Sequence, residues 1–274
     1  MSLRDLKVML TSVGLGLFIV TAALLFAQSC ESGKQETSES KPADESTGTA
    51  EKPLIDENQE QSLKGKLEAR KEQFIEQAPP EVADAFQRGI DEVWSTGIED
   101  NALAVGDQAV MFILPDATGD SISLEKLLAE GPVILTWYRG GWCPYCNLEL
   151  RAYQELLPKI NDLGAQLVAV SPEQPDSSLS TSEKLDLQYH VLSDLGNQVA
   201  KKYKIVFELP EETSEIMSSM IDLSAYNSDS SGELPIPATF VIDQDGIIRY
   251  AYVDSDYRRR AEPAEVLEAI EQLK

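Results

Sequence analysis

Short continuous apolar runs in the second half of the chain predict buried β-strands. The runs 133–138, 166–170 and 238–243 are rich in β-branched and aromatic residues, and Gly131-Pro132 precedes the first of them. The turn signal Asp245-Gly246 joins the third run to another apolar run that ends at Val253, which predicts a β-hairpin.

Apolar residues spaced by three or four positions predict helices between these strands and after them. One helix follows the first strand, and its apolar face consists of Leu148, Ala152, Leu156 and Ile160. A terminal helix covers 262–273, with Pro263 in its first turn. Strands that alternate with helices favour an α/β sandwich, which we expect to begin near Val105.

Residues 61–104 show helical spacing in a charged background. A first partial stripe contains Leu63, Leu67, Phe74 and Ile75, and Pro79-Pro80 ends it. A second stripe contains Val82, Phe86, Ile90 and Val93. We interpret this segment as a helical extension with a structural role.

The N-terminal segment predicts export. Arg4 and Lys7 precede an uncharged apolar run at 8–27, and about 20 such residues span a bilayer. Three alternatives remain open: an uncleaved membrane anchor, a lipoprotein modified at Cys30, and cleavage at Ala27-Gln28-Ser29. In each case the basic end stays cytoplasmic, so the catalytic domain is expected on the extracytoplasmic (periplasmic or outer) side.

Residues 31–60 are rich in Ser, Thr and Glu and almost free of large apolar side chains. Such a segment buries too little apolar surface to offset its ordering entropy, so we expect a disordered acidic linker. The predicted organisation is an anchor segment at 1–30, the linker at 31–60, the helical extension at 61–104 and a folded domain at 105–274.

Composition excludes several classes of function. The 274 residues carry a net charge of -24, which argues against nucleic-acid binding, because neutralising phosphates requires clustered Lys and Arg. Three cysteines are too few for a disulfide scaffold, and the single His excludes a His-rich metal site. The isolated His190 falls in a predicted strand, and we assign it no catalytic role.

The segment that carries chemistry is Cys143-Pro-Tyr-Cys146, placed between the first strand and an amphipathic helix. Free N–H groups and the positive end of the dipole at a helix start both stabilise a thiolate, so they lower the pKa of a cysteine. The two-residue spacing lets the sulfurs form a disulfide. Inert core cysteines and a purely structural disulfide are the alternatives.

Two further segments bear on this site. Pro237 precedes a predicted strand and would suit a cis-proline loop beside the cysteines. Trp142 and Tyr145 are expected to pack beside the disulfide rather than to bind a cofactor. The charged run at 254–260 is expected to form a solvated loop with local ion pairs.

The sequence resembles the alkyl hydroperoxide reductase/thiol-specific antioxidant family, the peroxiredoxin branch of the thioredoxin superfamily. The resemblance spans residues 105–274 and is nearest to a peroxiredoxin-like subgroup with an R-G-G-W-C-P-Y-C-N signature. It is carried by 106–116, 137–149, 170–173, 192–194 and 236–243. The resemblance implies a thioredoxin-like fold, with a central mixed sheet and helices on both faces. It also implies reduction of hydrogen peroxide or organic hydroperoxides by cysteine, a thioredoxin-like electron donor, and no metal or organic cofactor.

The family motif T-x-x-C-x-x-E aligns Cys146 with the peroxidatic cysteine and Glu149 with the acid. Cys143 stands where the family has Thr, and Pro237 stands near the point where the family has an Arg, and both departures are thioredoxin-like. Arg139 is the candidate for the missing positive charge, with a bracing role in the loop as the alternative.

Two enzymatic functions therefore remain open. In the leading one, Cys146 attacks a peroxide, becomes a sulfenic acid and forms a disulfide with Cys143, which a thioredoxin-like donor reduces. In the alternative, a membrane-tethered thiol-disulfide oxidoreductase uses Cys143 to attack disulfides of exported proteins, and Cys146 resolves the mixed disulfide. A binding module with a structural disulfide is the non-enzymatic alternative.

Overall fold

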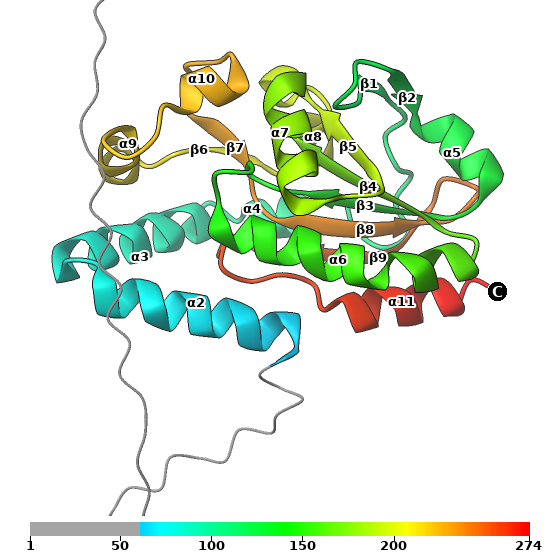
Figure 1. Ribbon diagram of the computed structural model, residues 1–274, viewed down its shortest axis with the longest axis horizontal. Coiled ribbons are helices and arrows are strands. Elements are labelled where there is room, and N and C mark those ends of the chain that lie inside the picture. The colour runs from blue at the N-terminus through cyan, green and yellow to red at the C-terminus, as the bar shows by residue number, and fades with distance from the viewer. Residues whose placement is uncertain (1–60) are drawn as a thin grey trace, which may run out of the picture. The chain divides into compact units, whose positions relative to one another are not determined.

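The computed structural model describes residues 61–274 and contains one five-stranded mixed sheet (Figure 1). The strand order is β5-β4-β3-β8-β9, with β3, β4 and β5 parallel and with β8 and β9 antiparallel to their neighbours. The strands are β3 (Val133–Trp137), β4 (Gln166–Ser171), β5 (His190–Ser193), β8 (Ala238–Ile242) and β9 (Ile248–Val253). The three predicted strands and the hairpin are confirmed, and His190 begins a strand.

Side chains of the central strand β3 alternate between the two faces of the sheet, as the period of two requires. Val133, Leu135 and Trp137 join the core under α5 (Leu124–Glu130) and α8 (Ala200–Tyr203), whereas Ile134 packs under α6 (Pro144–Asp162) and α11 (Pro263–Glu271). Helices therefore cover both faces, as expected. In Figure 1, α6 and α11 run along the same face of the sheet.

The remaining elements lie around this sheet. They are α4 (Ile98–Asn101), β1 (Ile113–Pro115), β2 (Ser121–Ser123), α7 (Pro175–Leu185), the 3₁₀ helix η1 (Leu195–Asn197), β6 (Val206–Glu208), α9 (Glu211–Ser218), α10 (Leu223–Asn227) and β7 (Glu233–Pro235).

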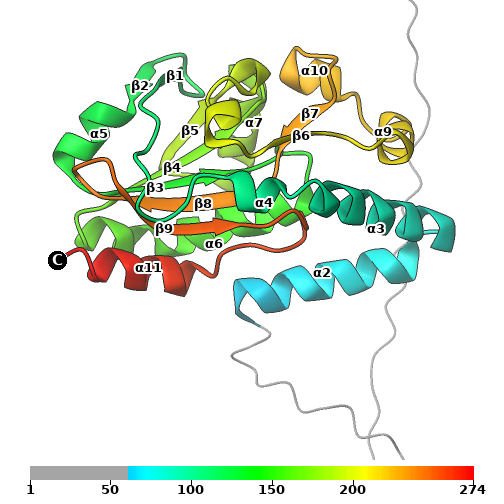
Figure 2. The ribbon, with the colours of Figure 1, turned by 180° about the vertical axis from the view of Figure 1, so that it is seen from behind.

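The helical extension consists of α2 (Leu63–Gln77) and α3 (Pro80–Ser95), and Pro79-Pro80 separates them as predicted. Helix α2 packs on α6 and α3 packs on α9. In both views the two helices lie at the end of the described structure away from the C-terminus (Figures 1 and 2). The predicted stripe of α2 is wrong at Ile75, which is 52% exposed.

The predicted apolar face of α6 is also partly wrong. Leu148 and Leu156 are half-buried, and the buried face is centred on Cys146, Leu150 and Tyr153 instead. A spacing of four residues rotates away from any one face, because a helix turn takes 3.6 residues.

The predicted anchor at 1–30 and linker at 31–60 lie outside the described residues. Within residues 61–274, every helix is too short or too polar to cross a membrane.

Candidate active site

The loop from β3 to α6 carries the cysteines. Cys143 is the N-cap of α6, and Pro144 occupies the first turn, where its missing N–H leaves no donor unpaired. A Cβ on Gly140, which has φ +154°, would lie 2.1 Å from the indole nitrogen of Trp142, and a Cβ on Gly141 would lie 1.9 Å from Thr181 Oγ1. Both glycines are therefore needed for the close packing of this loop.

Both cysteines are free thiols and are buried, with Cys143 1% and Cys146 0% exposed. The predicted disulfide stays a prediction. Burial disfavours the thiolate of Cys143, but the hydrogen bond with Cys146 and the charges of Arg139 and Arg260 outweigh it and lower the Cys143 pKa to about 5. Burial and the neighbouring thiolate raise the pKa of Cys146. The pair thus holds one negative charge at neutral pH.

Arg260 links Cys146 to Glu149. Its Nη2 lies 3.1 Å from Cys146 Sγ, and its Nε donates to Glu149 Oε2 at 2.6 Å. Arg260 is 6% exposed, and Ser255 and Asp256 are buried as well, so the prediction that 254–260 is a solvated loop is wrong at these three positions. The prediction of local ion pairs is confirmed at Arg258, which binds Asp256 at 2.7 Å.

Glu149 lies one helical turn after Cys146 and is fully buried. Its other oxygen accepts a hydrogen bond from Thr136 Oγ1 at 3.2 Å, and Thr136 contacts Thr239 Oγ1 at 2.9 Å. Burial raises the pKa of Glu149 to about 7, although the Arg260 charge and the Thr136 hydrogen bond act in the opposite direction. The role that the family motif implies for Glu149 stays a prediction.

Arg139 lies beside the other cysteine, Cys143. Its Nη1 is 3.9 Å from Cys143 Sγ, and its guanidinium lies over the rings of Trp142 at 5.0 Å and Tyr257 at 4.2 Å. Arg139 is 3% exposed, and its Nε has no hydrogen-bond partner among the described residues. The positive charge near the sulfurs is therefore supplied by two arginines, of which the sequence indicated only Arg139.

Glu173 is a second buried carboxyl group that our sequence interpretation did not assign to the site. Both of its oxygens accept the Gly141 N–H at 3.0 Å, which fixes the loop two residues before Cys143. Burial raises the pKa of Glu173 to about 7. The sequence signal that could have assigned Glu173 to the site was its position in the segment 170–173, at the end of a buried strand.

The other predicted residues lie near the same loop. Ala238 pairs with Trp137 across the sheet, so Pro237 lies at the edge from which the cysteine loop departs. Trp142 and Tyr145 pack in one apolar cluster with both cysteines, which confirms their predicted packing role.

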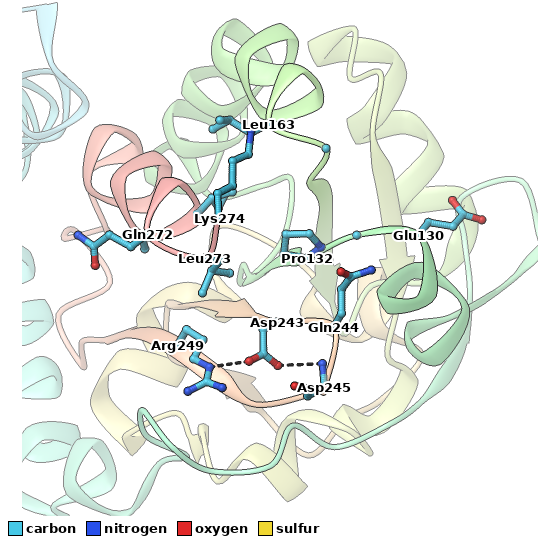
Figure 3. Close-up of a pocket in the computed structure, with 14 residues that line it drawn as sticks. Glu130, Pro132, Leu163, Asp243, Gln244, Asp245, Arg249, Gln272, Leu273 and Lys274 are labelled. Atoms are coloured by element: carbon cyan, nitrogen blue, oxygen red, sulfur yellow. Dashed lines mark hydrogen bonds and ion pairs between the residues drawn. The ribbon is translucent and has the colours of Figure 1, made fainter.

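Cys143, but not Cys146, lines a cavity of about 170 Å³. A larger cavity of about 750 Å³, shown in Figure 3, is lined by Pro132, Leu163 and Asp243. Pro132 precedes β3 and Leu163 follows α6, so the larger cavity lies at the opposite ends of these elements from the cysteines. Across residues 61–274, no group of three or more His, Cys, Asp or Glu side chains is placed to bind a metal ion.

Comparison with known proteins gives a family match over residues 105–251, to the model described as the AhpC/TSA family. A chloroplastic peroxiredoxin Q of Triticum aestivum is 27% identical over 179 residues, which cover 65% of this chain and 72% of that protein. The thiol-disulfide oxidoreductase ResA of Bacillus cereus is 25% identical over 149 residues, which cover 54% and 69%.

Among solved structures, the peroxidoxin BcpB of Mycobacterium tuberculosis matches with a TM-score of 0.50 and 23% identity, over 63% of this chain and 99% of that one. The peroxiredoxin 6 of Arenicola marina, solved as a cysteine-to-serine mutant, matches with a TM-score of 0.52 and 18% identity, over 62% and 73%. These likenesses show a thioredoxin-like α/β fold. The R-G-G-W-C-P-Y-C-N subgroup stays a prediction.

Proposed function

The chain belongs to the AhpC/TSA family, and we propose that it is a thiol-dependent peroxidase that works through Cys143 and Cys146. One observation carries the proposal: the two buried sulfurs face two buried guanidinium groups, one from Arg139 and one from Arg260. This arrangement stabilises a thiolate without solvent.

Within this chain, the bonds that form and break in the proposed chemistry involve only the two sulfurs. A thiolate attacks one oxygen of the peroxide, so that an S–O bond forms, the O–O bond breaks and the sulfur becomes a sulfenic acid. The departing oxygen takes a proton and leaves as water or an alcohol. The second thiol then condenses with the sulfenic acid, which forms the disulfide and releases water. An external dithiol, such as that of a thioredoxin-like protein, restores the two thiols: one of its sulfurs attacks the disulfide, and the other resolves the mixed disulfide, so that the donor leaves as a disulfide.

Family position and local geometry favour different attacking sulfurs. The family motif aligns Cys146 with the peroxidatic cysteine, whereas the low pKa and the cavity belong to Cys143. We assign the attack to Cys143, because a peroxide in the cavity reaches Cys143 first. Cys146 is then the resolving thiol, and Arg260 stabilises its charge as it ionises.

Thiol-disulfide exchange with exported proteins is the second candidate function. It is favoured by the position of Cys143 at the start of α6 and by the similarity to the protein named ResA. The burial of both sulfurs counts against it, because a protein disulfide must bring its own sulfur into contact with the attacking thiolate.

Rapid-mixing tryptophan fluorescence of the reduced protein with hydrogen peroxide tests the proposal, because Trp142 adjoins Cys143. We expect a reaction far faster than that of free cysteine, its loss in Cys143→Ser, and a sulfenic acid trapped at Cys143 in Cys146→Ser. A fast reaction retained in Cys143→Ser would return the attacking role to Cys146. Oxidation at the free-thiol rate would exclude the peroxidase, and reduction of a protein disulfide would then support the second candidate.

We further propose that the N-terminal segment holds the catalytic domain at the extracytoplasmic face of a membrane. The support is the uncharged apolar run at 8–27 after Arg4 and Lys7. Mass spectrometry of the mature N-terminus tests the form of attachment: a start at Met1 or Ser2 supports the anchor, and a lipid on Cys30 supports the lipoprotein.

A further inference from the structure

The cavity beside Cys143 is apolar and is completed by the helical extension. Its walls include Phe74 of α2, Phe86 of α3, Trp142, Met217 of α9, Ile221 and Tyr257. Phe74 and Phe86 meet edge to face, with their ring centroids 5.6 Å apart. Both helices precede residues 105–251, so this wall comes from outside the region that matches the family.

Arg139 places one charged group in the lining of this apolar space. Its Nη1 lies 3.9 Å from Cys143 Sγ. A substrate oxygen that reaches this sulfur therefore lies beside a buried cation that can donate a hydrogen bond to it. The other charged residue of the cavity is the half-buried Arg70.

The volume limits what the cavity accepts. Pockets for drug-sized ligands measure about 300–1,000 Å³, whereas this cavity measures about 170 Å³. It therefore suits a small molecule with one oxygen-bearing end and a compact apolar group. Hydrogen peroxide has no apolar group, so it makes no apolar contact with the side chains that line this cavity.

We propose that Phe74 and Phe86 are specificity-determining residues, which give this chain a preference for hydroperoxides that carry a compact apolar group. The proposal rests on the peroxidase function above. The apolar group packs against the two phenyl rings, the terminal oxygen lies between Arg139 and Cys143, and the bond changes are those already described, with an alcohol as the leaving product.

The test compares rate constants for oxidation of the reduced full chain by hydrogen peroxide, tert-butyl hydroperoxide and cumene hydroperoxide. For the unmodified chain we expect cumene hydroperoxide to react fastest. In Phe74→Ala and Phe86→Ala, the ratio of the cumene rate to the hydrogen peroxide rate should fall about 10-fold or more, the range typical of lost apolar contacts in a specificity pocket. Phe74→Leu, which disturbs packing less, should lower the ratio in the same direction.

Ile75→Ala is the matched control, because Ile75 neighbours Phe74 on α2 but is 52% exposed and does not line the cavity. It should leave both rates unchanged. If hydrogen peroxide reacts fast but the ratio of the cumene rate to the hydrogen peroxide rate is the same in the Phe variants and the unmodified chain, the proposed specificity is overturned. Slow reaction with all three peroxides would overturn the peroxidase function and this inference with it.

Discussion

Arg260 donates to the sulfur of Cys146 at 3.1 Å, although 114 positions separate the two residues in the sequence. The same guanidinium binds the carboxylate of Glu149 and the backbone carbonyls of Tyr257 and Arg259. A buried cation with all of its contacts fixed is therefore oriented toward the resolving sulfur before any reaction begins.

Replacing Arg260 by Met should slow formation of the disulfide by Cys146, the resolving step, by about 100-fold or more, the usual scale for loss of one oriented donor. The variant should also lose about 3–5 kcal/mol of stability, because Glu149 is left buried and unpaired. Rapid-mixing kinetics and urea unfolding measure the two effects.

The double variant Arg260→Met with Glu149→Gln separates the effect on the rate from the effect on stability. It should regain much of the lost stability, because the buried carboxylate is gone, without regaining the rate. Arg259→Met removes one charge from a side chain that is 69% exposed and serves as the control. Equal rates in Arg260→Met and Arg259→Met would contradict a role for Arg260 in the chemistry.

The rate of peroxide reduction should depend on pH through the first ionisation of the dithiol. The pKa of Cys143 is about 5, so the thiolate predominates above that pH and is lost as the pH falls below it. The rate constant should be nearly level from pH 6.5 to 8 and fall about tenfold per unit below pH 5. A rate that instead rises toward pH 9, the ordinary value for a thiol, would show that the thiolate is not stabilised.

Glu173 should make the reduced protein less stable as the pH rises from about 4.5 to about 7. Its pKa is raised to about 7 in the folded chain, so over this range the folded state binds more protons than the unfolded state. Glu173→Gln keeps an oxygen for the Gly141 N–H and removes the titration. Between pH 4.5 and 7.5, the unfolding free energy of this variant should therefore decline by about 1–3 kcal/mol less than that of the unmodified chain. If urea unfolding gives the same pH profile for Glu173→Gln and for the unmodified chain, Glu173 does not cause the loss of stability.

Adding a methyl group at Gly141 should destabilise the cysteine loop by about 1–3 kcal/mol, the usual effect of overpacking. The new Cβ would lie 1.9 Å from Thr181 Oγ1. Removing that oxygen in the double variant Gly141→Ala with Thr181→Ala should restore part of the stability, as thermal unfolding would report. No rescue would mean that the backbone of the loop, rather than Thr181, resists the change.

The fold was predictable from local signals because its strands are short, largely apolar and separated by clear breaks. Pro79-Pro80 and Asp245-Gly246 each mark a boundary that the structure keeps. Cys143 and Cys146 were recognisable from their spacing and from the helix that follows them.

The electrostatic environment of the cysteines was not predictable in the same way. Arg260 follows Arg258 and Arg259 in a charged run that looks solvated, and only one of the three is buried against Glu149. Which one turns inward depends on the path of the chain after β9, a tertiary property. The available signal was Glu149 itself, since an acid one turn after Cys146 on a buried helix face requires a cation or a proton.

The stabilised thiolate also has a consequence for the electron donor. A pKa lowered from 9.0 to about 5 stabilises the reduced pair at pH 7 by about 100-fold, and formation of the disulfide gives that stabilisation up. For a two-electron couple this raises the reduction potential by about 60 mV, which a redox titration against glutathione would measure. The charges that make the cysteine pair reactive therefore also make its disulfide an easier electron acceptor, so a comparatively weak reductant suffices to complete the cycle.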